Sequence, residues 1–136
     1  MIIDASVAVK WFLDEDGADH AFALIADHEL RAPPLLLAEV GNALWKKLRR
    51  HEARDPLDML ARHADLTQLV EIVDGQSKEL AVRALELALA LDHAIYDCVY
   101  LALSEMENDV LVTADDAFRR KVEKSDLARH VIALGA

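Results

Sequence analysis

The run Met1-Ile2-Ile3-Asp4 opens the chain, and a second short, mostly apolar run, Asp109-Val110-Leu111-Val112-Thr113, lies near the other end. Short runs of branched apolar residues are typical of strands that are buried on both faces, as in parallel sheets. Residues 69–73 fit the same pattern, and residues 131–134 fit it more weakly. We therefore predict a central sheet of short, buried strands at these four places.

Six longer segments between these runs carry apolar residues at helical spacing. They cover residues 7–13, 18–27, 35–51, 56–66, 78–91 and 94–107. Strands that alternate with helices predict an α/β fold, in which a mainly parallel sheet is flanked by helices on both faces. The length of 136 residues and the hydrophobic content of 54% fit one compact domain. We predict that this domain spans residues 1–136.

The composition excludes several classes of protein. Cys98 is the only cysteine, so no internal disulfide can form, and no Cys and His residues have the spacing of a zinc site. No run reaches the roughly 18 uncharged apolar residues of a membrane span, and the first apolar residues lack the basic flank of a signal peptide. We therefore expect a protein of the reducing cytoplasm that does not enter a membrane.

The net charge of −10 has the wrong sign for a protein that coats nucleic acid without specificity. Two local clusters of basic residues nevertheless stand out from this acidic background. The first is Lys46, Lys47, Arg49, Arg50 and Arg54, and the second is Arg119, Arg120, Lys121 and Lys124. The simplest explanation of either cluster taken alone is an ordinary solvated helix face.

Four carboxylates lie within or directly after apolar segments of the sequence: Asp4, Glu39, Asp97 and Asp115. A buried, unpaired carboxylate is costly, so four of them imply a shared partner, and a divalent cation is the simplest candidate. Asp4 and Asp115 follow predicted strands, and ligands of such sheets collect at the carboxyl ends of the strands. Glu39 and Asp97 reach the same site only if helices carry them there.

The two acids at strand ends also have explanations that need no metal. Asp4 can cap a helix that starts near Ser6, because an Asp side chain accepts hydrogen bonds from free amides at a helix start. Asp115 or Asp116 can cap the short helix that contains Phe118, and capping is compatible with binding a metal through the other oxygen.

The two acids on helices have similar alternatives. Glu39 can pair with a lysine, and Asn42 lies on the same helix face, where it can hydrogen-bond the carboxylate or a water on a metal. Asp97 can pair with His93, which lies four residues earlier and therefore shares its face. Each of these pairings can explain the position of one carboxylate. Together they do not explain why four carboxylates occur in apolar segments.

Four segments of the chain carry a resemblance to a known family. They are residues 3–7 (Ile-Asp-Ala-Ser-Val), 38–44 (Ala-Glu-Val-Gly-Asn-Ala-Leu), 96–102 (Tyr-Asp-Cys-Val-Tyr-Leu-Ala) and 111–115 (Leu-Val-Thr-Ala-Asp), the last followed by Phe118. In these segments the chain resembles the PIN-domain ribonucleases, and specifically the VapC-type toxins of bacterial and archaeal toxin–antitoxin pairs. The segments occur in the family's order, and the length of the chain fits one PIN-like domain from end to end.

The resemblance implies a metal site with known parts. Asp4, Glu39, Asp97 and Asp115 would bind one or two Mg²⁺ or Mn²⁺ ions, and the hydroxyls of Ser6 and Thr113 would lie beside them. Asp116 competes with Asp115 as the fourth ligand, although the family pattern of Thr, one residue and then the acid favours Asp115. The activity that follows is a Mg²⁺-dependent endoribonuclease, in which a water activated by the metal hydrolyses RNA phosphodiester bonds.

The resemblance also implies partners. A free ribonuclease harms its own cell, so a cognate VapB-type antitoxin is expected, with its C-terminal segment in an apolar groove on the toxin. Trp11, Phe12 and Trp45 are candidate walls of that groove. Toxins of this type usually form homodimers, but the sequence does not mark a dimer face.

Two rival classes of function stay open. A PIN-like module can keep the fold and its acids while being catalytically silent, and bind an antitoxin or RNA. Another phosphoryl-transfer domain of the doubly wound type would require a second acid two residues after Asp4, where this chain has Ser6.

Overall fold

The sheet has five strands in the order β3-β2-β1-β4-β5, and every pair of neighbours is parallel. The structure is a computed structural model that describes residues 1–51 and 55–136, so Arg54 of the first basic cluster lies outside the described residues. The strands are β1 (Ile2–Ile3), β2 (Arg31–Ala32), β3 (Glu71–Ile72), β4 (Leu111–Thr113) and β5 (Val131–Ala133). The prediction of an α/β fold with a mainly parallel sheet is confirmed.

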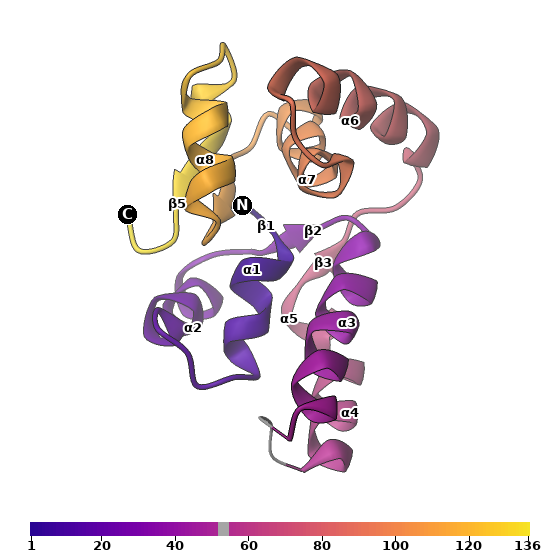
Figure 1. The fold of residues 1–136 in the computed structure, drawn as a ribbon, viewed down its shortest axis with the longest axis vertical. Coiled ribbons are helices and arrows are strands. Elements are labelled where there is room, and N and C mark those ends of the chain that lie inside the picture. Colours follow the sequence, from indigo (N-terminus) through magenta and orange to yellow (C-terminus); the bar gives the residue numbers. More distant parts are fainter. Residues whose placement is uncertain (52–54) are drawn as a thin grey trace.

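Helices cover both faces of this sheet, as predicted. They are α1 (Ala5–Ala8), α2 (Ala18–Asp27), α3 (Leu35–Arg49), α4 (Pro56–Ala64), α5 (Leu66–Leu69), α6 (Ser77–Leu91), α7 (Ile95–Met106) and α8 (Asp116–Glu123), with 3₁₀ turns η1 (Val9–Trp11) and η2 (Ala128–His130). Figure 1 shows α6, α7 and α8 on one side of the strands and α1 to α5 on the other. Right-handed crossovers produce this arrangement, because the chain moves along the sheet first from β1 to β3 and then back to β4 and β5.

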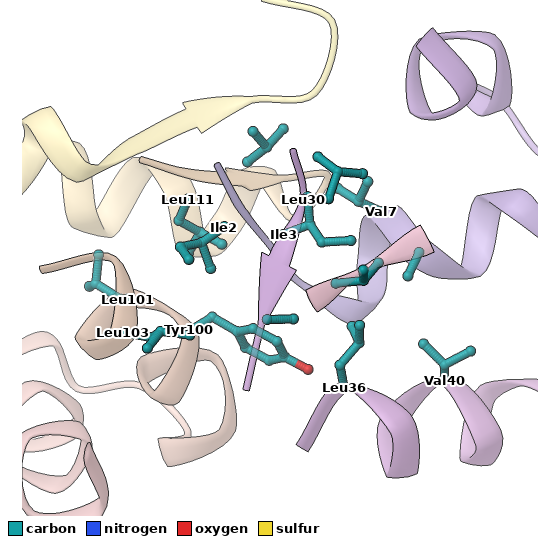
Figure 2. Packing of buried hydrophobic residues seen from close by; sticks show 14 of the residues in the cluster. Ile2, Ile3, Val7, Leu30, Leu36, Val40, Tyr100, Leu101, Leu103 and Leu111 are labelled. Carbon is teal, nitrogen blue, oxygen red and sulfur yellow. The ribbon is translucent and has the colours of Figure 1, made fainter. Parts of the chain in front are cut away.

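The core is centred on the two middle strands. Ile2 and Ile3 of β1 and Leu111 of β4 are fully buried, which explains why these strands are apolar at consecutive positions instead of alternating. The α7 side chains Tyr100 and Leu101 are also fully buried and pack against this part of the sheet (Figure 2). The helix that carries Asp97 is therefore in direct contact with the strand that precedes Asp4.

The sequence did not predict β2. This strand has only two residues, and one of them is Arg31, whose guanidinium reaches Glu107 at 2.8 Å and Glu71 at 3.2 Å. A charged residue in a two-residue strand leaves no apolar run to detect. The third predicted strand, residues 69–73, is shorter than expected, because Leu69 still belongs to α5 and only Glu71–Ile72 pair with β2.

Two predicted helices also differ in detail. The predicted helix 7–13 begins earlier, at Ala5, because the Asp4 side chain caps it, and it tightens into the η1 turn after Ala8. The predicted helix 56–66 ends at Ala64, and a separate short helix, α5, follows Asp65. These differences fall at helix ends, where sequence patterns are least informative.

The strand order creates a crevice between two neighbouring strands. From β1 the chain leaves toward β2, whereas from β4 it leaves toward β5 on the opposite side of the sheet. Parallel α/β sheets bind ligands where connections diverge in this way, outside the carboxyl ends of the strands. Asp4 comes directly after β1, and Asp115 comes two residues after the end of β4.

No single helix in the described parts of the chain is long and apolar enough to cross a membrane. The pair α6 and α7 meets the length and composition required only when both helices are counted together, and they are bent by 115° relative to each other.

We predict that Leu111→Ala lowers the free energy of unfolding by about 2–5 kcal/mol, because it removes a fully buried side chain beside β1. The measurement is urea unfolding followed by circular dichroism. Leu57→Ala is the matched control, because Leu57 is 74% exposed and its truncation is expected to change stability by less than about 0.5 kcal/mol. Equal losses in the two variants would contradict the assignment of β4 to the core.

Candidate active site

A pocket of about 250 Å³ opens where β1 and β4 end, and all four carboxylates singled out in the sequence line it. Its wall is formed by Asp4, Ala5, Ser6, Glu39, Asn42, Ala43, Lys46, Asp97 and Asp115. Strand ends supply Asp4 and Asp115, α3 supplies Glu39, and α7 supplies Asp97. Four segments that are far apart in the sequence thus contribute acids to one cavity.

Asp4 lies deepest, with 4% of its surface exposed. Its Oδ1 accepts a hydrogen bond from the Ser6 hydroxyl at 2.5 Å and from the Val7 amide at 3.2 Å, so it caps α1 as one alternative expected. Burial raises the pKa of Asp4 from its usual 3.8 to about 6, and nearby Asp97 adds to this rise, while the bonds from Ser6, Thr113 and the Val7 amide oppose it. Asp4 therefore both caps α1 and lines the pocket.

Ser6 joins the ends of the two central strands. Its Oγ accepts a hydrogen bond from the Ala114 amide at 2.9 Å and lies 3.4 Å from the Thr113 hydroxyl. The Thr113 Oγ1 in turn accepts a hydrogen bond from the Asp115 amide at 3.0 Å. The two hydroxyls thereby fix the loop that carries Asp115 against the loop that carries Asp4.

Glu39 accepts a hydrogen bond from the Tyr100 hydroxyl at 2.5 Å. Figure 2 shows the Tyr100 ring extending from α7 toward α3, with its hydroxyl directed at that helix. Burial raises the pKa of Glu39, and burial together with the Glu39 carboxylate raises the pKa of Tyr100. The alternative that Glu39 pairs with a lysine is wrong for the described residues, because its partner is this phenol.

The role of Tyr100 was not predicted from the sequence. The available signal was its spacing from Asp97, because residues three apart lie on the same face of a helix. The hydroxyl of a fully buried tyrosine also requires a hydrogen-bond partner, but only the fold shows that this partner is on α3.

Asp97 lies in the first turn of α7, where the partial positive charge of a helix N-terminus favours a carboxylate. Its Oδ2 is 2.6 Å from Nε2 of His93, so the expected pairing at helical spacing is present. The His93 ring lies against Phe118 of α8, with ring centroids 4.7 Å apart. This stacking fixes His93, and His93 in turn fixes the Asp97 side chain.

Asp115 and Asp116 occupy different environments. Asp115 lines the pocket and caps α8, because its Oδ1 accepts a hydrogen bond from the Phe118 amide at 2.9 Å. Asp116 is exposed, does not line the pocket and pairs with Arg119 at 3.0 Å. The structure therefore brings Asp115 together with the other acids and leaves Asp116 on the surface of α8.

Comparison with known proteins assigns the chain to a family. The family model described as PIN domain matches residues 1–124. The chain belongs to the PIN domain family. Ribonuclease VapC3 of Pyrobaculum aerophilum is 28% identical over 130 residues, which cover 89% of this chain and 93% of that protein. The crystal structure of PAE2754 from Pyrobaculum aerophilum shares the fold, with a TM-score of 0.72 and 24% identity over 98% of this chain and 88% of that chain.

The chemistry of this PIN domain pocket suits a hard cation, because its ionisable donors are carboxylate oxygens. Glu39, Asp97 and Asp115 each use one oxygen for a hydrogen bond to the protein, so in each the second oxygen is available as a ligand. In the conformations that the described residues adopt, no three Asp, Glu, His or Cys side chains are gathered as ligands of one ion. The carboxylate donor set nevertheless fits Mg²⁺ or Mn²⁺, because the oxygens that these hydrogen bonds leave free are of the kind that such ions take as ligands.

We predict that Asp4→Asn stabilises this PIN domain above pH 6 in the presence of EDTA. Because the pKa of Asp4 is raised in the folded state to about 6, its ionisation costs stability as the pH rises from about 4 to 6. Two pKa units correspond to about 3 kcal/mol. Asn retains the acceptor for Ser6 and Val7 but carries no charge.

Urea unfolding of both proteins between pH 4 and pH 8 tests this expectation. The stability difference between Asp4→Asn and the wild type is expected to grow from about pH 4 to pH 6 and then to stay level. A difference that does not change with pH would show that Asp4 ionises as freely in the folded chain as in the unfolded one.

Proposed function

We propose that this chain is the toxin of a toxin–antitoxin pair, a Mg²⁺-dependent endoribonuclease that hydrolyses RNA phosphodiester bonds. The observation that carries the proposal is the convergence of Asp4, Glu39, Asp97 and Asp115 on one pocket at the carboxyl ends of β1 and β4. Membership of the PIN domain family and the similarity to a protein named ribonuclease VapC3 support the same activity. Mn²⁺ is an alternative ion, because it accepts the same oxygen ligands.

The four carboxylates are the residues that would hold the ion. Such an ion would supply Lewis-acid chemistry: it would polarise the phosphodiester and make a water easier to deprotonate, so that a nucleophile would be available at neutral pH. No serine, cysteine or histidine of the chain is then required as a nucleophile. This is consistent with Cys98, which is fully buried and whose pKa is raised by burial to about 11.

The chain's own contribution is to hold the carboxylates in place. Ser6 restrains Asp4, Tyr100 restrains Glu39, and His93 restrains Asp97, each through one hydrogen bond of 2.5 to 2.6 Å. Charge-assisted bonds of this length fix a side chain strongly. Asn42 also lines the pocket, one turn after Glu39, and its amide can hydrogen-bond a water or a phosphate oxygen.

A second pocket, of about 450 Å³, is our candidate for the antitoxin's C-terminal segment. Trp11, Phe12 and Phe22 line it, so it offers apolar walls to a peptide. Its charged residues are balanced, with the bases Lys10, Lys47 and Arg62 and the acids Asp14, Glu15 and Asp58. Trp45, which the sequence also suggested as a wall, does not line this pocket and is 53% exposed. The proposal also includes a homodimer, which the resemblance implies, and a location in the cytoplasm, which the composition predicts.

We predict that the purified chain, free of partner, cleaves single-stranded RNA in the presence of Mg²⁺ and that EDTA abolishes the cleavage. Asp97→Asn is expected to lower the rate by about 100-fold or more, because it weakens the binding of the ion that activates water. The measurement is gel analysis of an end-labelled RNA mixture.

Asp116→Asn is the matched control for this experiment, because Asp116 lies outside the pocket and its variant is expected to keep the wild-type rate. Cleavage that survives EDTA, or that is equal in Asp97→Asn and the wild type, would refute the metal mechanism. A chain that binds RNA but cleaves none would favour the catalytically silent PIN-like module.

We also predict that Mn²⁺ or Mg²⁺ raises the melting temperature of the wild type, because an ion that binds only the folded chain stabilises it. At 100 times the dissociation constant the gain is about 2.7 kcal/mol. Glu39→Gln and Asp97→Asn are each expected to lose most of this gain, measured by differential scanning calorimetry with NaCl at equal ionic strength as the reference. An equal increase in melting temperature in the wild type and in both variants would show that the ion binds outside the acidic pocket.

A further inference from the structure

Lys46 stands out in the wall of the acidic pocket. It lines the same cavity as the four carboxylates, and the other residues of the lining are acidic or uncharged. Lys46 follows Glu39 by seven residues and Asn42 by four on α3, a spacing that places all three on one face of the helix. The helix therefore presents an acid, an amide and an ammonium group in a row along one side of the pocket.

The neighbouring basic residues of α3 are engaged elsewhere. Lys47 is 3.7 Å from Glu15 and lines the larger pocket instead. The Arg49 guanidinium lies 5.1 Å from the centre of the Trp45 ring. The basic cluster predicted from the sequence is thus divided between several surfaces, and Lys46 is its member at the acidic pocket.

Lys46 is exposed and, within residues 1–51 and 55–136, forms no ion pair. This is unexpected for a lysine beside four carboxylates. Lys46 is exposed whereas Asp4 is 4% exposed, so Lys46 lies toward the mouth of the pocket and Asp4 lies at the bottom. Seven residues of helix also separate Lys46 from Glu39 by about 10 Å along the axis. An ammonium group in this position is available to an anion that enters from solvent.

We propose that Lys46 binds a phosphate group of the RNA strand that enters the acidic pocket. This inference rests on the proposed ribonuclease function, because it concerns the substrate of that same site. The carboxylates of the pocket repel the RNA, which is a polyanion. A positive charge at the entrance of the pocket reduces this repulsion and so favours RNA binding. The flexible lysine side chain provides a mobile point charge for a phosphate oxygen.

The rival explanation is that Lys46 only offsets the repulsion among the carboxylates. The two roles differ in what the charge acts on. A lysine that binds phosphate controls RNA affinity and its dependence on salt, whereas a lysine that offsets the acids controls the affinity of the pocket for Mn²⁺.

The test compares Lys46→Gln with Lys46→Arg and with Lys78→Gln. Lys78→Gln makes the same change in net charge at the first turn of α6, about 20 Å along that helix from the end that leads to His93. Binding of a fluorescein-labelled, mixed-sequence single-stranded RNA is measured by anisotropy in an Asp97→Asn background, which leaves the RNA intact. Mn²⁺ affinity, by calorimetry, and steady-state cleavage are both measured in proteins that keep Asp97.

Lys46→Gln is expected to weaken RNA binding roughly tenfold, the loss of one charge-assisted hydrogen bond. The slope of log affinity against log salt is expected to fall in magnitude by about 0.7, the value for one phosphate of a single strand. In Lys46→Gln, KM is expected to rise by the same factor, while kcat and Mn²⁺ affinity stay within about twofold of the wild type. Lys46→Arg is expected to restore most of the RNA binding. Lys78→Gln is expected to match the wild type.

Wild-type RNA affinity and salt slope in Lys46→Gln, with cleavage intact, would overturn this inference and leave the proposed function standing. A change in Mn²⁺ affinity without a change in the salt slope would overturn it in favour of charge compensation. A wild type that neither binds nor cleaves RNA would overturn both proposals.

Discussion

The burial of Asp4 at the end of β1 is the constraint on which both the fold and the site depend. The carboxylate caps α1 through the Val7 amide, and the Ser6 hydroxyl that donates to it also anchors the loop after β4. Because the group is desolvated and lies near Asp97, its charged form is disfavoured. The same contacts that begin the first helix therefore hold an unfavourable charge at the bottom of the pocket.

The sequence was sufficient to predict the parts of the molecule that depend on local patterns. Asp4 and Asp115 follow apolar strand runs, so their meeting at one edge of a parallel sheet could be expected from the sequence alone. Asp97 was conspicuous because its helix is apolar on most sides. Strand β2 was missed because a two-residue strand that contains Arg31 has no detectable pattern.

What the sequence could not supply are the contacts between helices. Tyr100 donates to Glu39 across 61 residues of chain, and its role depends on where the fold places α7 relative to α3. On α3, helical spacing places Lys46 on the face of Glu39 and turns Lys47 about 100° away, but it does not show which surface each lysine meets. Only the packing of α3 separates Lys46 from Lys47 and assigns them to different pockets.

Each acid of the pocket has a structural task as well as a candidate catalytic one. Asp4 and Asp115 cap helices, Glu39 satisfies a buried phenol, and Asp97 bonds His93. These tasks use one oxygen of Glu39, Asp97 and Asp115 and leave the second oxygen for a ligand, so the two roles do not compete for the same atom. Such sharing explains why the simple structural alternatives are correct for Asp4, Asp97 and Asp115, and why Glu39 has a protein partner too, although a phenol and not a lysine. None of these pairings explains why four carboxylates meet. Their mutual repulsion costs the folded chain stability, and the cation that we propose for this pocket would remove this cost.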